Sequence, residues 1–276
     1  MTRAPWAEVI GDPVTQSKSP AIHRFWLAGL GLPGAFHATR VTPARLPAFI
    51  AARRSEPGWH GCSVTIPHKQ AVIAHLDGLA AAARSVGAVN CIHRDGDRLV
   101  GANTDVDGVM AAIDLHRATL RRPVLIGAGG AARAALAALR ARGVKELAIV
   151  ARDRAAAARL AGAFGLSARA FSLDESDRAL AGADFVIQAT PLGMQAMPPV
   201  PAVLLDALAG LAAGAVVFDM VYAPLETELL RRAGALSLRR VNGLVMLVGQ
   251  ARAAFRLLFG AEAPPDEAAL MARLAP

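Results

Sequence analysis

The fold is decided by residues 123–132, which read Pro-Val-Leu-Ile-Gly-Ala-Gly-Gly-Ala-Ala. The apolar run over 123–126 predicts a buried strand, and the alanine-rich segment from Gly130 to Arg142 predicts a helix. Between them the glycines fit the pattern Gly-x-Gly-x-x-Gly/Ala, with Ala132 in the third small position. In a dinucleotide-binding fold these glycines permit a tight turn and a close approach to a pyrophosphate at the helix N-terminus. An ordinary strand–helix turn is the alternative interpretation.

The next predicted strand, over 146–150, bears on the choice between NAD and NADP. An acidic residue at its end would hold the ribose 2′-hydroxyl of NAD, whereas arginines favour the 2′-phosphate of NADP. The chain continues with Arg152, Asp153 and Arg154. The two arginines favour NADP and Asp153 argues for NAD. Alternatively, all three form a solvated helix start with Asp153 as its N-cap.

Around this region the chain alternates strands with helices. Strands are predicted over 7–11, 62–66 and 89–93 in the first part, and over 146–150, 185–189 and 216–220 in the second. Such alternation indicates an α/β protein with a parallel sheet covered on both faces. The second part begins near Val106, and an amphipathic helix is predicted over 244–259 near the end of the chain.

Length and composition exclude several classes of protein. The chain has 276 residues, of which 54% are hydrophobic and 19% charged, so it can form two domains with buried cores. The longest uncharged stretch, 185–205, contains several prolines and predicts no membrane-spanning helix. The N-terminus has no apolar segment of signal-peptide length. With only Cys62 and Cys91, we expect buried thiols rather than disulfides, and a cytoplasmic location.

The net charge of +8 leaves nucleic acid as one possible partner. The basic residues are scattered, however, and aromatic residues make up 5% of the chain. An anionic substrate and an anionic cofactor explain the charge at least as well. We therefore expect no nucleic-acid partner.

The segment Ser17-Lys18-Ser19-Pro20 carries the first candidate chemistry outside the nucleotide-binding stretch. Pro20 suits the first turn of a helix and Ser19 suits its N-cap. Two hydroxyls beside a helix N-terminus could also bind a carboxylate, because the donors and the helix dipole favour an anion there. Capping alone is the alternative.

Lys69 and Asp105 are candidates for acid–base chemistry. Lys69 follows a strand predicted to end at Pro67, at the kind of sheet edge where ligands gather in α/β folds, and a lysine there could donate or accept a proton. Asp105 ends the segment Asn-Thr-Asp near the predicted junction of the two parts, and Asn90 ends Gly-Ala-Val-Asn. Taken singly, a solvated lysine and an aspartate in a turn are the ordinary alternatives.

Taken together and in this order, the motifs resemble those of the shikimate/quinate dehydrogenase family. The shared motifs are SKSP (17–20), VTIPHK (64–69), GAVN (87–90), NTD (103–105), GAGGAAR (127–133), ATPLGM (189–194), DMVY (219–222) and GLVMLVGQA (243–251). They extend from residue 17 to residue 251, which is nearly the whole chain.

The resemblance implies a two-domain α/β protein. Residues 1–105, joined by C-terminal helices over 244–276, would form an α/β substrate-binding and catalytic domain. Residues 106–243 would form a Rossmann-type doubly wound NADP-binding domain. The implied activity is the reversible reduction of 3-dehydroshikimate to shikimate in the biosynthesis of aromatic amino acids, with NADP (NADPH) as cofactor and without a metal ion. The implied assembly is a monomer or a homodimer.

The resemblance also implies roles for individual residues, with Lys69 and Asp105 as the catalytic pair. The implied substrate-binding residues are Ser17, Ser19, Ser63, Thr65, Asn90, Tyr222 and Gln250. The implied cofactor-binding residues are Gly127, Ala128, Gly129, Gly130, Ala131, Arg152, Asp153, Arg154, Thr190, Met220 and Gly243.

Several positions depart from the family pattern. Ser63 stands where the family usually has asparagine, Ala151 and Asp153 depart from a usual Asn-Arg-Thr, and Val245 replaces a usual glycine. Ser63 and Asp153 keep open a quinate/shikimate dehydrogenase or a shikimate dehydrogenase-like paralogue that uses NAD or NADP. A non-catalytic NADP-binding regulator would need a broken catalytic pair, and both Lys69 and Asp105 are present.

Overall fold

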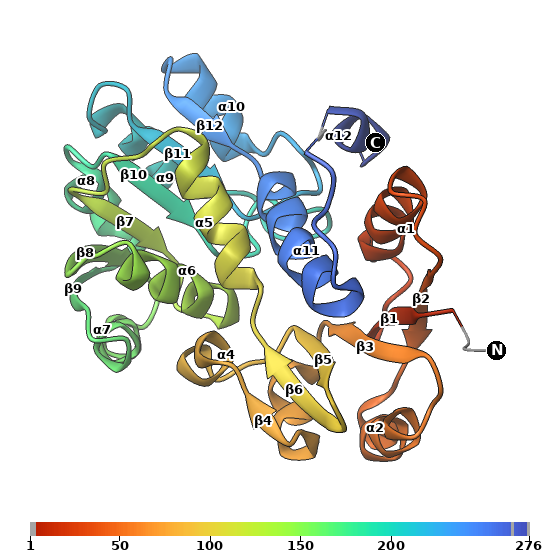
Figure 1. Ribbon diagram of the computed structural model, residues 1–276. Coiled ribbons are helices and arrows are strands. Elements are labelled where there is room, and N and C mark those ends of the chain that lie inside the picture. Colours follow the sequence, from red (N-terminus) through yellow and green to blue (C-terminus); the bar gives the residue numbers. More distant parts are fainter. Residues whose placement is uncertain (1–3, 266–267, 275–276) are drawn as a thin grey trace. The chain divides into compact units, whose positions relative to one another are not determined.

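The computed structural model describes residues 4–265 and 268–274. Contacts within the chain divide it into two compact units. The first unit runs to Asp105 and resumes at Gln250, and the second comprises Val106–Gly249. Both contain strands and helices (Figure 1).

The first unit contains one mixed sheet. Its strands are β1 (Trp6–Gly11), β2 (Ala35–Arg40), β3 (Trp59–Val64), β4 (Gly78–Leu79), β5 (Cys91–Asp95) and β6 (Arg98–Ala102). Its helices are α1 (Ser19–Gly29), α2 (Leu46–Arg54), α3 (His68–Ala71), α4 (Ala81–Val86) and α12 (Ala268–Leu274), with 3-10 helices η1 (Pro43–Arg45) and η2 (Val72–His75). Helix α5 (Asp105–Leu115) starts at the unit boundary, and α11 (Gly243–Phe259) runs through the other boundary.

The strand order of this sheet is β2-β1-β3-β5-β6-β4. Strand β1 is parallel to β2 and β3, but β5 is antiparallel to both β3 and β6. The predicted parallel arrangement is therefore wrong for β5, whereas β4 is again parallel to β6. The β5–β6 pairing is antiparallel because a hairpin joins the two strands, in which Asp95 pairs with Arg98 across Gly96 and Asp97, and Gly96 has a φ of 60°. Glycine readily adopts the left-handed conformation that such tight turns need.

Two local predictions in this unit are also wrong. Helix α1 starts at Ser19, with Lys18 at the N-cap in a helical conformation and no side-chain cap, so Ser19 is not the N-cap. Strand β3 ends at Val64 instead of reaching Ile66. The chain then turns, His68 N–H donating to the Thr65 carbonyl, and Pro67 has no N–H to continue the ladder. Lys69 consequently lies in the short helix α3.

The second unit contains a parallel sheet. Its strands are β7 (Pro123–Ile126), β8 (Glu146–Val150), β9 (Ser167–Phe171), β10 (Phe185–Gln188), β11 (Val216–Asp219) and β12 (Arg239–Val241). Its helices are α6 (Gly130–Ala141), α7 (Arg154–Ala163), α8 (Ser176–Leu180), α9 (Ala202–Ala207) and α10 (Glu228–Ala235), with 3-10 helices η3 (Leu173–Glu175) and η4 (Leu208–Gly210).

The strand order β12-β11-β10-β7-β8-β9 is doubly wound, because the chain starts at the central β7, moves out to β9 and returns to β10 on the other side. All its pairings are parallel. This confirms the predicted Rossmann-type α/β fold. The connections after β7 and β10 leave in opposite directions, and that switch point is where such sheets bind their ligands.

Packing on both faces explains why the central strands are apolar. Val124 and Ile126 belong to a buried cluster that includes Leu204 of α9 and Leu229 of α10. Leu125, between them, is fully buried on the opposite face, since successive side chains of a strand alternate. Among the described residues, no helix has the length and apolar character needed to cross a bilayer.

Candidate active site

Lys69 and Asp105 form an ion pair in the first unit, although they are 36 residues apart in sequence. Lys69 Nζ donates to Asp105 Oδ2 at 2.6 Å, and the two side chains are 32% and 19% exposed. Val89 N–H donates to the Lys69 carbonyl, which ties helix α3 to the loop before β5. The pair therefore remains accessible to a small molecule while its backbone is fixed.

Asn90 connects this pair to the rest of the unit. Its Nδ2 donates to Asp105 Oδ1 at 2.9 Å and to Thr104 Oγ1 at 3.0 Å, while its Oδ1 accepts from Thr104 N–H at 2.6 Å. Gln250 of α11 completes the group, with its Oε1 at 3.5 Å from Asn90 Nδ2 and 3.4 Å from Thr104 Oγ1. Asn90 and Thr104 are buried, so the network holds the Asp105 carboxylate in one orientation.

The other candidate substrate residues of the first unit lie on or after strands β1 and β3. Ser17 follows β1 and accepts a hydrogen bond from Ser19 N–H at 3.3 Å, and Ser19 is buried at the start of α1. Ser63 is the buried penultimate residue of β3, and Thr65 follows its end, with its N–H donating to the Ile10 carbonyl. The carboxyl ends of these parallel strands share one edge of the sheet. Tyr222, half-buried, belongs to the second unit.

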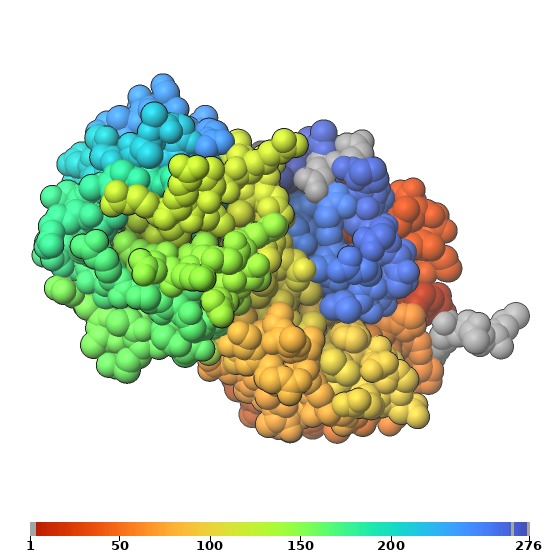
Figure 2. All heavy atoms as spheres, turned by 60° about the vertical axis from the view of Figure 1, so that its left-hand side comes forward, coloured from red at the N-terminus to blue at the C-terminus, as the bar shows by residue number. Residues whose placement is uncertain are grey.

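The glycine turn after β7 fits the expected nucleotide-binding conformation. Gly127 has a φ of 106°, and a Cβ there would lie 2.7 Å from Thr190 Cγ2, so both the backbone and the space demand glycine. At Gly129 and Gly130 an added Cβ would meet nothing within 4 Å. These two glycines and Ala131 are exposed, Ala128 is half-buried, and α6 lies at the surface of this unit in the light-green area of Figure 2. No side chain caps α6, so its first N–H groups are available to an anion.

The residues after β8 differ in their surroundings. Asp153 is the N-cap of α7 and its Oδ1 accepts from Ala156 N–H at 2.8 Å, as one of the sequence interpretations proposed. Arg154 forms an ion pair of 3.1 Å with Glu175. Arg152 is exposed at the end of β8. Because Asp153 Oδ1 already accepts a hydrogen bond from Ala156 N–H, Asp153 is less available to bind the ribose 2′-hydroxyl of NAD. Of the two arginines, Arg154 is paired with Glu175, whereas the exposed Arg152 is accessible to an anion such as a 2′-phosphate.

Gly243 and Met220 lie together in the second unit. A Cβ on Gly243 would clash with the Met220 carbonyl oxygen, and Gly243 N–H donates to the Val221 carbonyl at 3.1 Å. Any side chain at position 243 would push the two segments apart. The family resemblance placed both residues near the nicotinamide, and the structure brings them into backbone contact.

Other reactive side chains are buried away from solvent. Cys62 and Cys91 are fully buried free thiols, as expected, and burial raises the pKa of Cys91 to about 12. His68 is buried and its Nε2 lies 2.6 Å from the Val41 carbonyl oxygen, which fits a structural role. Neither thiol is therefore a nucleophile at neutral pH.

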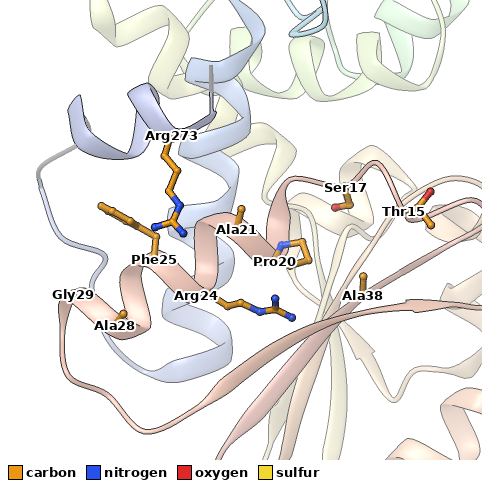
Figure 3. Close-up of a pocket in the computed structure, with 10 residues that line it drawn as sticks. All are labelled: Thr15, Ser17, Pro20, Ala21, Arg24, Phe25, Ala28, Gly29, Ala38 and Arg273. Carbon is orange, nitrogen blue, oxygen red and sulfur yellow. The ribbon is translucent and has the colours of Figure 1, made fainter. Parts of the chain in front are cut away.

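A groove of about 860 Å³ lies along α1, and it is lined also by Ala38 of β2 and Arg273 of α12 (Figure 3). Ser17 lies at one end of the groove. Neither Lys69 nor Asp105 lines it. Geometry and chemistry therefore favour the Lys69 network, rather than this groove, as the candidate active site.

Sequence reasoning missed three buried polar residues near these sites. Thr104 joins the Asn90 network, Gln188 ends β10, and Asp219 ends β11. A polar residue that closes an otherwise apolar strand could have identified Gln188 and Asp219. Thr104 lies inside the quoted motif NTD, and no separate pattern marks it.

Comparisons with known proteins agree along the chain. The shikimate dehydrogenase substrate binding domain matches residues 9–92, the shikimate/quinate 5-dehydrogenase family matches 110–194, and the shikimate 5′-dehydrogenase C-terminal domain matches 243–272. A shikimate dehydrogenase (NADP(+)) of Sphingopyxis alaskensis is 45% identical over 268 residues, covering 96% of this chain and 93% of that protein.

Solved structures extend this agreement to three dimensions. The shikimate 5-dehydrogenase of Thermus thermophilus in complex with NADP(H) and shikimate is 35% identical, with a TM-score of 0.84 over 99% of this chain and 100% of that one. A quinate dehydrogenase from Corynebacterium glutamicum in complex with NAD is 32% identical, with a TM-score of 0.85 over 95% of each chain. At this identity and coverage, the chain belongs to the shikimate dehydrogenase family.

Proposed function

We propose that this protein catalyses the NADP-dependent, reversible reduction of 3-dehydroshikimate to shikimate. The observation that carries the proposal is the Lys69–Asp105 ion pair of 2.6 Å, held by Asn90 in the unit that matches the substrate binding domain. A regulator without activity would have no need to keep an accessible ammonium group against an oriented carboxylate. The names of the relatives supply the substrate and the cofactor.

Each member of the pair has a distinct task in this proposal. When bound, NADPH supplies the hydride that reduces the carbonyl carbon. Lys69 Nζ donates a proton to the oxygen on which negative charge develops, or stabilises that charge. Asp105 accepts a hydrogen bond from Lys69 and binds substrate hydroxyls, and Asn90 keeps the carboxylate from rotating.

The remaining residues would hold the rest of the substrate and the cofactor. Ser17, Ser19 and Tyr222 are proposed to bind the substrate carboxylate, because hydroxyl groups are suitable donors to an anion. Ser63, Thr65, Asn90 and Gln250 are proposed to bind ring hydroxyls. The backbone from Gly127 to Ala131 would hold the pyrophosphate, Arg152 with Arg154 the 2′-phosphate, and Thr190, Met220 and Gly243 the nicotinamide side.

Initial rates with shikimate or quinate, each with NADP or NAD, test the proposal through the absorbance of the reduced nicotinamide. Fast turnover with shikimate and NADP alone is the expected result. Turnover that favours quinate or NAD would assign the protein to the quinate-type paralogues and make Ser63 and Asp153 the specificity-determining residues. Absence of turnover with every pair would overturn the proposal. A cytoplasmic location and a monomeric or homodimeric state stay predictions from the sequence.

A further inference from the structure

Two buried polar side chains lie side by side at the carboxyl end of the second unit's sheet. Gln188 ends β10 and Asp219 ends β11, and the two residues are register partners. Both are 0% exposed, while the other residues of these strands are apolar. Burying an amide or a carboxylate is unfavourable unless its hydrogen bonds are made. The partners of each group therefore indicate what it does.

Gln188 makes four hydrogen bonds to the loop that follows β10. Its Oε1 accepts from Thr190 N–H at 2.7 Å and from Thr190 Oγ1 at 2.8 Å. Its Nε2 donates to the carbonyls of Thr190 at 3.2 Å and Leu192 at 3.1 Å. One amide thus fixes the turn from Thr190 to Leu192, and Thr190 packs against Gly127 of the glycine turn.

Asp219 does the same for the loop that follows β11. Its Oδ1 accepts from Val221 N–H at 3.0 Å, and its Oδ2 accepts from Thr227 Oγ1 at 2.6 Å. Thr227 in turn caps α10 by accepting from Leu230 N–H. The Val221 carbonyl accepts from Gly243 N–H, so the carboxylate indirectly sets the position of Gly243.

The two loops are also joined to each other. Met220 N–H donates to the Gln188 carbonyl at 3.0 Å, and Gln195 N–H donates to the Ala223 carbonyl at 3.0 Å. A shift of either loop would therefore be transmitted to the other. The joined segments flank the switch point of the sheet, where doubly wound folds bind dinucleotides.

We propose that Gln188 and Asp219 are positioning residues that hold the 189–194 and 220–223 loops in the conformation that binds NADP. The inference rests on the proposed function, because it assigns these loops to the cofactor of that reaction. Neither side chain is exposed, so each acts through the backbone that it holds rather than by touching the cofactor.

The test compares Gln188→Met, which keeps the length and removes all four hydrogen bonds, with Gln195→Met directly after the 189–194 loop, whose side chain is exposed. Titration of NADPH fluorescence should show a Kd raised by about tenfold or more for Gln188→Met, since small displacements of binding groups weaken binding and catalysis strongly. The KM for NADP should rise with it, while the KM for shikimate stays within about twofold. A Gln188→Met variant with a lower melting temperature but the wild-type Kd would overturn the proposal.

Further variants keep the test decisive. If Gln188→Met does not fold, Gln188→Leu replaces it, because it also removes all four hydrogen bonds; a wild-type Kd for it would equally overturn the proposal. Asp219→Ala should weaken NADPH binding and Asp219→Asn should restore it, because an amide oxygen still accepts from Val221 N–H. Equal binding by both would remove Asp219 from the proposal. Wild-type protein that fails to bind NADPH would instead contradict the proposed function.

Discussion

At the scale of single residues, Lys69 is the group whose loss should separate catalysis from cofactor binding. Lys69→Ala removes the ammonium group beside Asp105 and touches no residue of the glycine turn. We expect kcat to fall by about 10²–10⁴-fold, the usual contribution of a positioned acid or base, with the Kd for NADPH unchanged. Lys145→Ala, at an exposed lysine, is the control. Substantial residual turnover would mean that the proton comes from another group.

Ser63 is the residue where substrate preference should be adjustable. It is buried in β3 between its ladder neighbours Val9 and Cys91, next to the turn that carries Lys69. An asparagine there offers an amide where serine offers one hydroxyl. We expect Ser63→Asn to lower the KM for shikimate and to leave kcat within about tenfold of wild type. Ser55→Asn at an exposed position is the control, and an unchanged KM for Ser63→Asn would contradict this role.

At the scale of elements, the packing of α1 contains an acid-sensitive residue. His23 is fully buried and stacks on Phe36 at 4.1 Å, with Trp26 and Phe255 of α11 around it. Within residues 4–265 and 268–274, neither of its ring nitrogens has a hydrogen-bond partner. Burial lowers the pKa of His23 from 6.5 to about 3. The folded protein therefore keeps this ring neutral, and unfolding lets it take up a proton.

The sign of the pH dependence follows from that difference. The contribution of His23 to stability is fully present above the unfolded pKa of 6.5 and is lost as the pH falls towards 3, by about 1.4 kcal/mol per pH unit. His23→Phe keeps the stacking and removes the titration. Chemical denaturation gives the free energy of unfolding of each protein. We expect the value for His23→Phe minus that for wild type to be about 2 kcal/mol larger at about pH 5 than at about pH 7.5. Parallel pH profiles for His23→Phe and wild type would contradict the prediction.

Asp219 should show the opposite slope. Burial raises the pKa of Asp219 from 3.8 to about 6, so the folded state binds its proton more tightly than the unfolded state. The charged carboxylate thus costs stability above pH 6, and that cost disappears as the pH falls below 3.8. Asp219→Asn, which retains an acceptor for Val221, should raise the free energy of unfolding by up to about 3 kcal/mol at neutral pH and by little at about pH 4. Equal stability of the two proteins at neutral pH would contradict it.

Elements that are apolar throughout were predictable from the sequence, whereas elements defined by their neighbours were not. Strands β7 and β8 have the predicted bounds, because buried parallel strands read as apolar runs, continuous in β7 and preceded by the exposed Glu146 in β8. Strand β2 was missed: it buries Phe36 alone and is a strand because β1 pairs with it. Strand β12 is three residues long with two exposed arginines, and it depends on β11 in the same way.

At the scale of the whole molecule, the site is an assembly of distant segments, and this limits what spacing can reveal. Lys69, Asn90 and Asp105 were candidates from their places in the sequence, but Gln250 and the pairing of Lys69 with Asp105 were expected only from the family resemblance. Nothing in a separation of 36 residues predicts a 2.6 Å contact between Lys69 and Asp105. Gln188 and Asp219 each close an apolar strand, which marks them as unusual, but their hydrogen-bond partners in the following loops cannot be identified from the sequence.

Cofactor choice can be measured through the stability of the whole molecule, because a ligand that binds the folded state stabilises it by mass action. At about 100 times its Kd, NADPH should add about 2.7 kcal/mol. For chains of roughly this size each kcal/mol raises the melting temperature by about 2–4 °C, so we expect a shift of about 5–10 °C with NADPH. NADH at the same concentration should give a clearly smaller shift, because it lacks the phosphate that the exposed Arg152 would meet.

Arg152→Ala tests the residue behind that preference. The variant should bring the NADPH shift down to that of NADH, while Arg159→Ala, at an exposed arginine within α7, should leave the difference intact. If Arg152→Ala retains the full NADPH preference, the 2′-phosphate is bound by another group, and Arg154 must leave Glu175 to bind it. If NADPH and NADH raise the melting temperature of the wild-type protein equally, Asp153 accepts a hydrogen bond from the ribose 2′-hydroxyl in addition to capping α7. The NAD-using paralogue then becomes the better assignment.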